Sequence, residues 1–492
     1  MLVWRRRWLT VSVLAVLGAP TGALSGFLMP RGPVSAGPAL LMMIMGLLLG
    51  ALAGLVTGRW WSIFLVLITH LVALELIRWP VDGPTVDGIH LSTTYGVVAF
   101  VTGRAFSTLL LILPAVVGVI YGAGLARRLS GVTRTHRARS LLVRRVLAAC
   151  AVAVLGGMAL VAQPGRTAPI LGADGQPLHG SIAELSTARV GDHDTTLMLH
   201  GDSTAAPVLL YLAGGPGGTD IGAMRLFSES LEQDFVVATS DQRGTGTSYG
   251  ALDPTSTLTL DSAVDYTIQL VEQLRARFDQ DRVYLVGNSW GTVLGVLAVQ
   301  RRPDLFAAYV GTGQMVSLTD TDQMFYEDSL AWARRTGNAK LEQTLVSNGP
   351  PPYDNLLNYE ASSLHEREWN AYARTLAYAD HGEMPANVNV DEYDLVQKVR
   401  ALAATMDTFA AIYPQLQDID FRNQAAQLQI PIYLVQGRHE ARGRAVLAQE
   451  RFDTVDAPTK KWIEFAQSGH RPLFEEPDRF AEVMRSVLAD VR

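Results

Sequence analysis

Hydrophobic and polar positions divide the chain into two parts with different patterns. Up to residue 162, apolar runs carry few charges, and each is long enough, or almost long enough, to cross a bilayer as a helix. These runs are Trp8–Leu28, Pro38–Thr57, Trp61–Ile77, Phe106–Ala126 and Val146–Ala162. The pattern predicts an all-α transmembrane region of about five helices over residues 1–162.

From about residue 180 onward, short apolar runs alternate with helical patterns. Within Ser262–Phe278, for example, Val264, Ile268, Val271 and Leu274 fall on one helical face. The predicted strands are Thr195–His200, Pro207–Leu212, Phe235–Thr239, Val283–Val286, Ala308–Gly311, Ile430–Val435 and Lys461–Phe465. This alternation predicts a mainly parallel sheet with helices on both faces, and an antiparallel edge formed by the first strands.

Two segments interrupt this alternation and suggest the domain boundaries. Residues 163–180 are rich in proline and glycine without periodicity, which is typical of a linker. Residues 315–425 hold helical patterns but no clear strand, so we expect a helical cap there. The cap would separate a first part of the sheet domain, residues 181–314, from a second part, residues 426–492.

Charge placement predicts how the apolar region is oriented. Arginines gather before the first run and between the fourth and fifth runs: Arg5, Arg6, Arg7, Arg127, Arg128, Arg134, Arg137, Arg139, Arg144 and Arg145. Such clusters stay in the cytoplasm, so five crossings would place the second half of the chain on the extracytoplasmic side of the cell membrane. Residues 1–23 also fit a cleaved signal peptide, and the four remaining runs would still deliver that half outside.

The composition argues against nucleic acid as a partner, against an intramolecular disulfide, and against a bound metal. The net charge is −6, and the second half has no basic cluster of the kind that binds nucleic acid. Cys150 is the one cysteine, so an intramolecular disulfide is impossible. No His, Cys or carboxylate cluster has metal-ligand spacing, and we expect neither a metal nor a cofactor.

The strongest chemical motif is Gly287-Asn288-Ser289-Trp290-Gly291, which follows the strand Val283–Val286 and precedes a helical stretch. A G-x-S-x-G sequence between a strand and a helix is a nucleophile elbow, which exposes a serine on a strained turn. Glycine fits two positions before and after the serine because it has no Cβ to clash. Ser289 is therefore the predicted nucleophile, against the alternative of an ordinary turn serine.

A serine nucleophile needs a base, and the base needs an orienting acid. His470 follows the last predicted strand, and Glu440 follows the strand before it. Serine, then acid, then histidine is the chain order of the α/β-hydrolase triad. The alternatives are His439 as base, Asp453 or Asp456 as acid, and a solvated Glu440 paired with its arginine neighbours Arg438, Arg442 or Arg444.

A glycine-rich loop supplies the predicted oxyanion hole. Residues 213–218, Ala-Gly-Gly-Pro-Gly-Gly, follow the strand Pro207–Leu212. Backbone N–H groups of Gly215 and Trp290 are the predicted donors to the charge on a tetrahedral intermediate. The loop lacks the Lys-Ser/Thr ending of a phosphate-binding P-loop. After the next strand, Asp241 and Arg243 are expected to tie loops together beneath the site.

Gly-Gly-Pro-Gly-Gly, Asp-Gln-Arg-Gly-x-Gly-x-Ser and Gly-x-Ser-Trp-Gly in this order resemble the proline iminopeptidase and tripeptidyl aminopeptidase family of α/β-hydrolase serine peptidases. The resemblance spans about residues 180–492 and implies an eight-stranded sheet with a helical cap. It assigns Ser289 as nucleophile, His470 as base, and Gly215 with Trp290 as oxyanion donors. The chain departs from the family at Ala213, Asn288 and Glu440, where the family usually has His, Gly and Asp.

The resemblance implies release of N-terminal residues from peptides through an acyl-enzyme, so a carboxylate should bind the substrate amine. The cap offers the acids Glu327, Glu360, Glu366, Glu368, Asp380 and Glu383, and the aromatic residues Tyr326, Trp332, Tyr353, Tyr359 and Trp369. The sequence singles out none of them. The alternative functions are an esterase or lipase-like hydrolase of amphiphilic esters, and a non-catalytic membrane receptor with a hydrolase-like domain.

Overall fold

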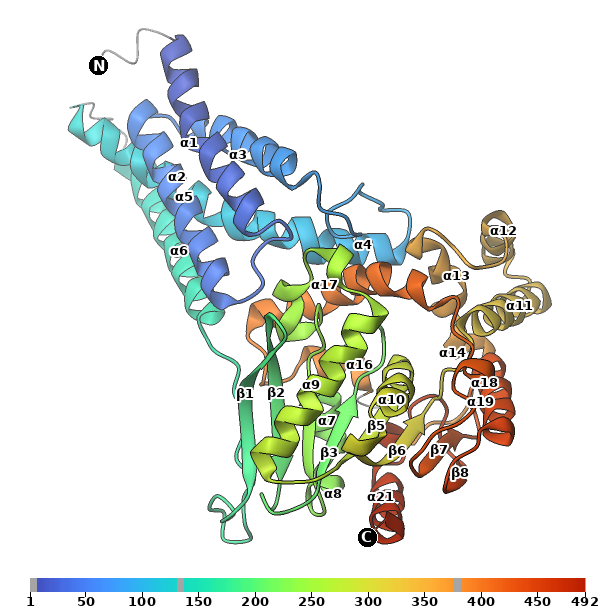
Figure 1. Cartoon of the computed structure of the whole chain (residues 1–492). Helices are drawn as coiled ribbons and strands as arrows, with labels where there is room; N and C mark the ends of the chain where they lie inside the picture. The colour runs from blue at the N-terminus through green and yellow to red at the C-terminus, as the bar shows by residue number, and fades with distance from the viewer. Residues whose placement is uncertain (1–6, 131–136, 376–377, 379–381, 492) are drawn as a thin grey trace. The chain divides into compact units, whose positions relative to one another are not determined.

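The computed structural model describes residues 7–130, 137–375, 378 and 382–491 (Figure 1). Arg5, Arg6, Arg134 and Asp380, which the sequence analysis singled out, lie outside the described residues. The chain divides into two compact units. The first comprises Met1–Ser92, Gly96–Gly165 and Tyr393–Ala403, and the second comprises Thr93–Tyr95, Arg166–Glu392 and Ala404–Arg492.

Each of the five predicted apolar runs forms a helix. The helices are α1 (Arg7–Leu28), α2 (Ala36–Thr57), α3 (Ser62–Arg78), α5 (Phe106–Leu129) and α6 (Arg137–Val161). Helix α4 (Thr94–Phe100) and a π-helical turn, η2 (Val101–Ala105), extend α5 toward the N-terminus. Among the described residues, 3 helical segments are long and apolar enough to cross a membrane: Val11–Leu28, Ala36–Thr57 and Thr94–Leu129. Helix α3 and the apolar part of α6, Arg145–Val161, are shorter.

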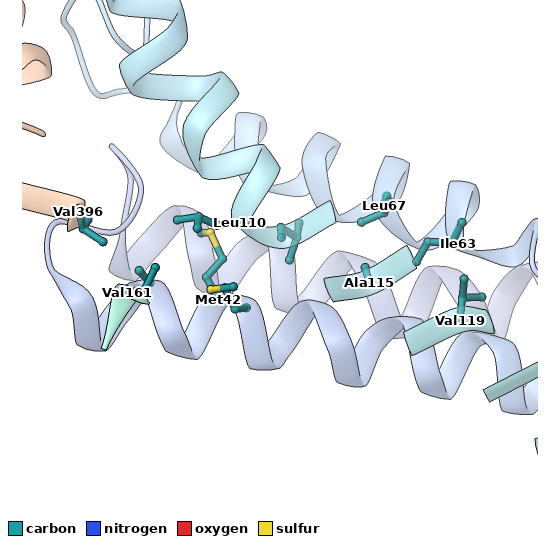
Figure 2. Close-up of a cluster of buried hydrophobic side chains, with 11 residues drawn as sticks. Met42, Ile63, Leu67, Leu110, Ala115, Val119, Val161 and Val396 are labelled. Atoms are coloured by element: carbon teal, nitrogen blue, oxygen red, sulfur yellow. The ribbon is translucent and has the colours of Figure 1, made fainter. Parts of the chain in front are cut away.

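Helix packing explains why part of the cap segment belongs to the first unit. Met42, Leu110, Val119 and Val161 lie in one buried cluster with Val396, near the start of α17 (Leu395–Ile412) (Figure 2). Arg400, also on α17, is fully buried and donates to the carbonyl oxygens of Pro33 and Thr102, at 2.7 Å each. These bonds satisfy donors of a guanidinium that burial removes from water.

The second unit is built on an eight-stranded sheet in the order β1-β2-β4-β3-β5-β6-β7-β8 (Figure 1). The strands are β1 (Ile182–Val190), β2 (His193–Gly201), β3 (Val208–Leu212), β4 (Val236–Ser240), β5 (Val283–Asn288), β6 (Phe306–Thr312), β7 (Ile432–Gly437) and β8 (Lys460–Phe465). Strands β1, β2 and β4 pair antiparallel, as predicted for this edge, and all other pairs are parallel. The carboxyl ends of β3, β5, β7 and β8 therefore meet at one edge of the sheet.

Strand β1 was missed because its side chains do not form an apolar run. It lies at the edge of the sheet, and its middle residues are only partly buried. The other seven strands correspond to the predicted ones. Their residues in β3 to β7 are buried throughout, which explains why each appears in the sequence as a continuous apolar stretch.

Two groups of helices pack on this sheet. Helices α9 (Leu260–Phe278) and α10 (Trp290–Arg301) contact each other and β5. The second group is α7 (Ile221–Phe227), α8 (Glu229–Glu232), α20 (Pro472–Glu475) and α21 (Pro477–Val491). Helix α9 begins at a capping box of Thr259 and Ser262, and the four apolar residues predicted for one face are largely buried.

Between β6 and β7, the described residues contain helices and no named strand. The helices are α11 (Leu318–Thr336), α12 (Ala339–Asn348), α13 (Glu360–Ser363), α14 (Glu366–Trp369), α16 (Glu383–Val388), α17 and α18 (Phe421–Gln424). Short 3₁₀ turns and α19 (Arg442–Thr454) complete the unit. This helical segment lies where the sequence predicts a cap, and its residues Tyr393–Ala403 belong to the first unit.

Candidate active site

Ser289 occupies the sharp turn between β5 and α10. Its backbone has φ 52° and ψ −119°, and it is one of two non-glycine residues among those described with positive φ. Such a conformation is strained for an L-residue and is typical of functional turns. The turn also requires the flanking glycines. A Cβ at Gly287 would lie 2.6 Å from the carbonyl oxygen of Gly291, and one at Gly291 would lie 2.1 Å from that of Leu212.

His470 and Glu440 form a close pair at the same sheet edge. The Nδ1 atom of His470 lies 2.7 Å from the Oε2 atom of Glu440, whose side chain is 1% exposed. An ionised carboxylate only accepts, so Nδ1 carries the hydrogen and Nε2 is left free to accept a proton. The imidazole is 21% exposed and can therefore meet a substrate. The pairing that the chain order predicted is present in the fold.

Asn288 and Thr312 connect the serine turn to the histidine loop. The carbonyl oxygen of Thr312 accepts the backbone N–H of Ser289 at 3.0 Å. The Asn288 side-chain amide donates to the hydroxyl of Thr312 at 2.8 Å and to the carbonyl oxygen of His470 at 3.3 Å. Next to Thr312, a Cβ on Gly313 would lie 2.7 Å from the His470 ring. Asn288, where the resembled family often has glycine, thus joins the nucleophile turn to the base loop.

Glu440 is held in its ionised form by its neighbours. It accepts the backbone N–H of Ala441 at 2.8 Å and the Nε–H of Arg444 at 2.8 Å. Burial by itself raises the pKa of Glu440, but the charges and hydrogen bonds of Arg444 and His470 outweigh burial and lower this pKa to about 2. Arg444 also pairs with Glu366 and lies over the Phe325 ring, 4.6 Å from its centroid. Of the three arginines considered as surface partners, only Arg444 binds Glu440, and this pair is buried.

Acidification should therefore remove stability that ionised Glu440 supplies. The folded-state pKa of about 2 lies below the ordinary value of 4.5, so this stability is present above pH 4.5 and is lost as pH falls through 2. Over that window, the unfolding free energy of the natural chain should drop by about 3 kcal/mol relative to Glu440→Gln. Denaturant titrations of the two full-length proteins in detergent at several pH values would measure the difference. Parallel pH dependences would contradict a depressed pKa.

The glycine-rich loop after β3 is held by Gln242, from the Asp-Gln-Arg motif that follows β4. Gln242 donates from Nε2 to the carbonyl oxygen of Ala213 at 3.2 Å. Its Oε1 atom accepts the indole N–H of Trp290 at 2.7 Å. Trp290 is the first residue of α10, where a backbone N–H has no acceptor within the helix. Gln242 therefore connects the two segments that carry the predicted oxyanion donors, a role that the sequence analysis did not assign.

Removing this connection should impair turnover more than binding. Gln242→Ala leaves both backbone donors in the chain but frees Trp290 and the Ala213 carbonyl from their shared partner, so we expect kcat to fall about 10-fold with little change in KM. Steady-state kinetics on an activated ester would measure this split. Gln300→Ala is the matched control, because Gln300 is an exposed glutamine on α10 that bonds to the Gln424 carbonyl. Equal effects of the two substitutions would argue against the assigned role.

Asp241 and Arg243 have the structural roles predicted for them. Asp241 accepts the hydroxyl of Thr219 at 2.6 Å and the backbone N–H of Thr247 at 2.8 Å. Arg243 donates to the carbonyl oxygens of Ala251 and Thr257, at 2.8 and 3.0 Å. These bonds tie the loop after β4 to Thr219, which directly follows the glycine-rich segment, and hold residues 247–257 in place.

The five acids proposed for the substrate amine that lie among the described residues have other partners. Glu327 pairs with Arg442, Glu366 with Arg444, Glu368 with His365 and Glu383 with Arg471, while Glu360 accepts the backbone N–H groups of Thr94 and Tyr95. Burial raises the pKa of Glu383 to about 6 although Arg471 opposes this rise. Of the five cap aromatics, Tyr353 and Tyr359 line a common cavity. Among the described residues, no group of three or more His, Cys, Asp or Glu side chains is arranged to hold a metal ion.

Comparisons with known proteins identify the fold family of the chain. The family model described as alpha/beta hydrolase fold matches residues 207–477. The protein named "Probable aminopeptidase YbaC" of Bacillus subtilis (strain 168) is 28% identical over 311 residues, which cover 63% of this chain and 97% of that protein. The "Probable proline iminopeptidase" of Leptolyngbya boryana is 29% identical over 132 residues, 27% of this chain and 39% of that protein.

Among solved structures, a proline iminopeptidase-related protein of Thermus thermophilus is 20% identical, with a TM-score of 0.46, over 63% of this chain and 98% of that one. The family model carries the assignment, because the residues it matches make up more than half of the chain and include Ser289, Glu440 and His470. From the strand order, the serine turn and this match together, we conclude that the chain belongs to the α/β-hydrolase fold family.

Proposed function

We propose that the protein is a membrane-anchored serine hydrolase, and that it is an aminopeptidase that releases N-terminal residues from peptides through an acyl-enzyme. The observation that carries the proposal is the buried Glu440–His470 pair, with its 2.7 Å contact, at the sheet edge where Ser289 sits on a positive-φ turn. A carboxylate, an imidazole and a raised serine at the ends of parallel strands are the parts of an acyl-transfer site.

In the proposed reaction, His470 accepts the hydroxyl proton of Ser289 while the serine oxygen attacks the substrate carbonyl carbon. Glu440 stabilises the imidazolium that forms, and the backbone N–H groups of Gly215 and Trp290 donate to the oxyanion. His470 then gives the proton to the leaving amine, which leaves an ester of Ser289. A water molecule, deprotonated by His470, hydrolyses this ester and restores the site.

The peptidase activity is supported by the relatives. The Bacillus protein that is 28% identical is named an aminopeptidase, and its match extends over 97% of its own length. The motifs that resemble the proline iminopeptidase family coincide with the serine turn and the glycine-rich loop of this chain. A peptide with a free N-terminus is therefore the substrate class of the proposal.

The membrane anchor belongs to the same proposal. Apolar helical segments such as Ala36–Thr57 are long enough to cross a bilayer. The arginines that precede the first apolar run and follow the fourth favour a cytoplasmic location for both, which would put the hydrolase unit on the extracytoplasmic side. The lipid bilayer would then be the partner of the first unit.

A digest of a peptide library by the full-length protein in detergent, analysed by mass spectrometry, would test the activity. The proposal expects products shortened from the N-terminus and no cleavage of N-acetylated peptides. Hydrolysis rates on a proline or alanine arylamide and on a short p-nitrophenyl ester would separate the aminopeptidase from the esterase or lipase-like alternative. An amide rate below a few per cent of the ester rate would replace the aminopeptidase with the esterase or lipase-like alternative.

A further inference from the structure

A cavity of about 370 Å³ lies in the second unit, apart from the residues assigned to catalysis. Its volume is typical of small-molecule sites. Four aromatic side chains dominate its lining: Tyr353, Tyr359, Phe409 and Tyr413. Two of these rings, Phe409 and Tyr413, come from α17 and the 3₁₀ turn η7 (Tyr413–Leu416) that follows it.

Tyr359 meets its neighbouring rings at steep angles, and one other pair of rings is stacked. Tyr359 is edge-on to Tyr353 at 73° and to Tyr413 at 77°, with centroid distances of 4.8 and 5.2 Å. Phe409 and Tyr413 lie nearly parallel, 4.1 Å apart. An aromatic face carries the negative part of the ring quadrupole, so the ring faces that remain open to the cavity attract a cation.

Polar groups in the lining are already bonded to the protein. The hydroxyl of Tyr353 donates to the carbonyl oxygen of Gly349 at 2.7 Å, and that of Tyr359 accepts the backbone N–H of Tyr353 at 3.2 Å. Gln417 accepts from the Thr319 hydroxyl through Oε1 at 3.1 Å. Apart from the exposed carboxylate of Asp354, the lining therefore offers aromatic rings more than free hydrogen-bond acceptors, and this favours a cation that carries no N–H donors.

A carboxylate lies behind the rings. Asp322, on α11, accepts the hydroxyl of Tyr413 at 2.6 Å and the Nε2–H of Gln417 at 3.4 Å. Burial raises the pKa of Asp322 to about 7, and the groups in the described chain that lower it are neutral hydrogen-bond donors rather than cations. A positive charge in the cavity would compensate this carboxylate. Asp354, exposed at the rim, adds a second negative charge.

We propose that this cavity binds a quaternary ammonium group, held by the aromatic rings that line it and by the charge of Asp322. Rings and a rear carboxylate, with few free acceptors, match the chemistry of a methylated cation rather than that of a primary ammonium. Such a group occurs in choline-type lipid headgroups and in soluble phosphocholine compounds.

The cavity is close to the glycine-rich loop but distinct from the catalytic residues. On α17, Thr405 bonds to the carbonyl oxygen of Gly217 at 3.4 Å, and Phe409 follows about 6 Å further along the helix axis. On α11, Phe325 contacts Arg444, the partner of Glu440, one turn after Asp322. A bound cation would therefore contact the same two helices, α11 and α17, that contact Arg444 and the glycine-rich loop, and it can select substrates that carry this group.

Titration calorimetry on the full-length protein in a maltoside detergent tests the proposal. We expect saturable binding of tetramethylammonium chloride and at least about 10-fold weaker binding of ammonium chloride at equal ionic strength. Phe409→Leu keeps an apolar side chain of similar size but removes a ring face, and should weaken binding about 5-fold or more. Phe409→Tyr keeps the ring and should bind as the natural chain does. Asp322→Asn should weaken binding several-fold.

A melting temperature and labelling of Ser289 by a fluorophosphonate establish that each variant is folded, independently of the outcome for peptides.

Phosphocholine in solution, and bilayer discs of phosphatidylcholine or phosphatidylglycerol, distinguish a lipid headgroup from a soluble compound as the source of the quaternary ammonium group. If tetramethylammonium binds more weakly in phosphatidylcholine discs than in phosphatidylglycerol discs, the lipid headgroup competes for the cavity and is the ligand. If phosphocholine binds but phosphatidylcholine discs do not weaken the binding of tetramethylammonium, the ligand is soluble.

Three results would overturn the proposal: no saturable binding of tetramethylammonium, equal binding of ammonium, or equal binding to the natural chain and to folded Phe409→Leu. Tighter binding of alaninamide than of tetramethylammonium would assign the cavity to a primary amine instead. Because calorimetry needs no turnover, these outcomes are separate from any failure of the proposed aminopeptidase activity.

Discussion

Replacement of Ser289 by alanine should abolish turnover, with a loss of about 10⁴-fold or more in kcat. The proposed reaction proceeds through an ester of this side chain, and the other parts of a triad achieve little without the nucleophile. His470→Ala should cost about as much, since an unactivated hydroxyl is a weak nucleophile. Hydrolysis of an activated ester by the purified full-length proteins would measure both losses.

A fluorophosphonate probe checks the same prediction without a known substrate. The natural chain should be labelled, whereas Ser289→Ala should not. Ser203→Ala is the control, because Ser203 is exposed in the loop before β3 and should not affect labelling. Persistent labelling of Ser289→Ala would place the nucleophile elsewhere. Absence of labelling in the natural chain would favour the non-catalytic receptor.

Replacement of Glu440 by alanine should reduce kcat by about 10²- to 10⁴-fold, less than loss of the nucleophile. In the proposed reaction, Glu440 orients the imidazole through the 2.7 Å contact to Nδ1 and stabilises its charged form, but it does not react with the substrate. The substitution also leaves the buried guanidinium of Arg444 with only Glu366 as its carboxylate partner. Lower stability should therefore accompany the loss of activity.

Glu440→Gln separates these two effects, because it keeps the shape and removes the charge. Its kcat should stay low, while an intact melting profile would show that the fold is retained. Asp453→Ala is the control for the alternative acid. Asp453 is exposed and accepts from Gln449, and Asp456 is also exposed. Near-full activity of Glu440→Ala together with loss of activity in Asp453→Ala would mean that the wrong acid has been assigned.

Local sequence patterns were sufficient for most of the fold. Apolar runs such as that of β5 are buried on both faces, so their composition alone indicates central strands. The face of α9 was predictable because Val264 and Ile268 recur at helical spacing. The edge strand β1 was not, since its partly exposed residues carry no such signal.

The candidate site was predictable to a similar extent. The turn at Ser289 has a strict local requirement for glycine two positions away, and that requirement appears directly as a motif. The histidine and its acid were predictable from chain order, because parallel strands bring their carboxyl ends to one edge. The role of Gln242 was not, because its partners Ala213 and Trp290 are far from it in the sequence.

The sequence by itself therefore determined the elements, the order of the triad and the positions of the strained turns, because these depend on neighbouring residues. Only the tertiary structure decided which charges meet. It selected Arg444 rather than Arg438 or Arg442 as the partner of Glu440, and it joined Asp322 on α11 to Tyr413, 91 positions later. Such contacts depend on burial and distance across the folded chain, and residue type and spacing do not encode either one directly.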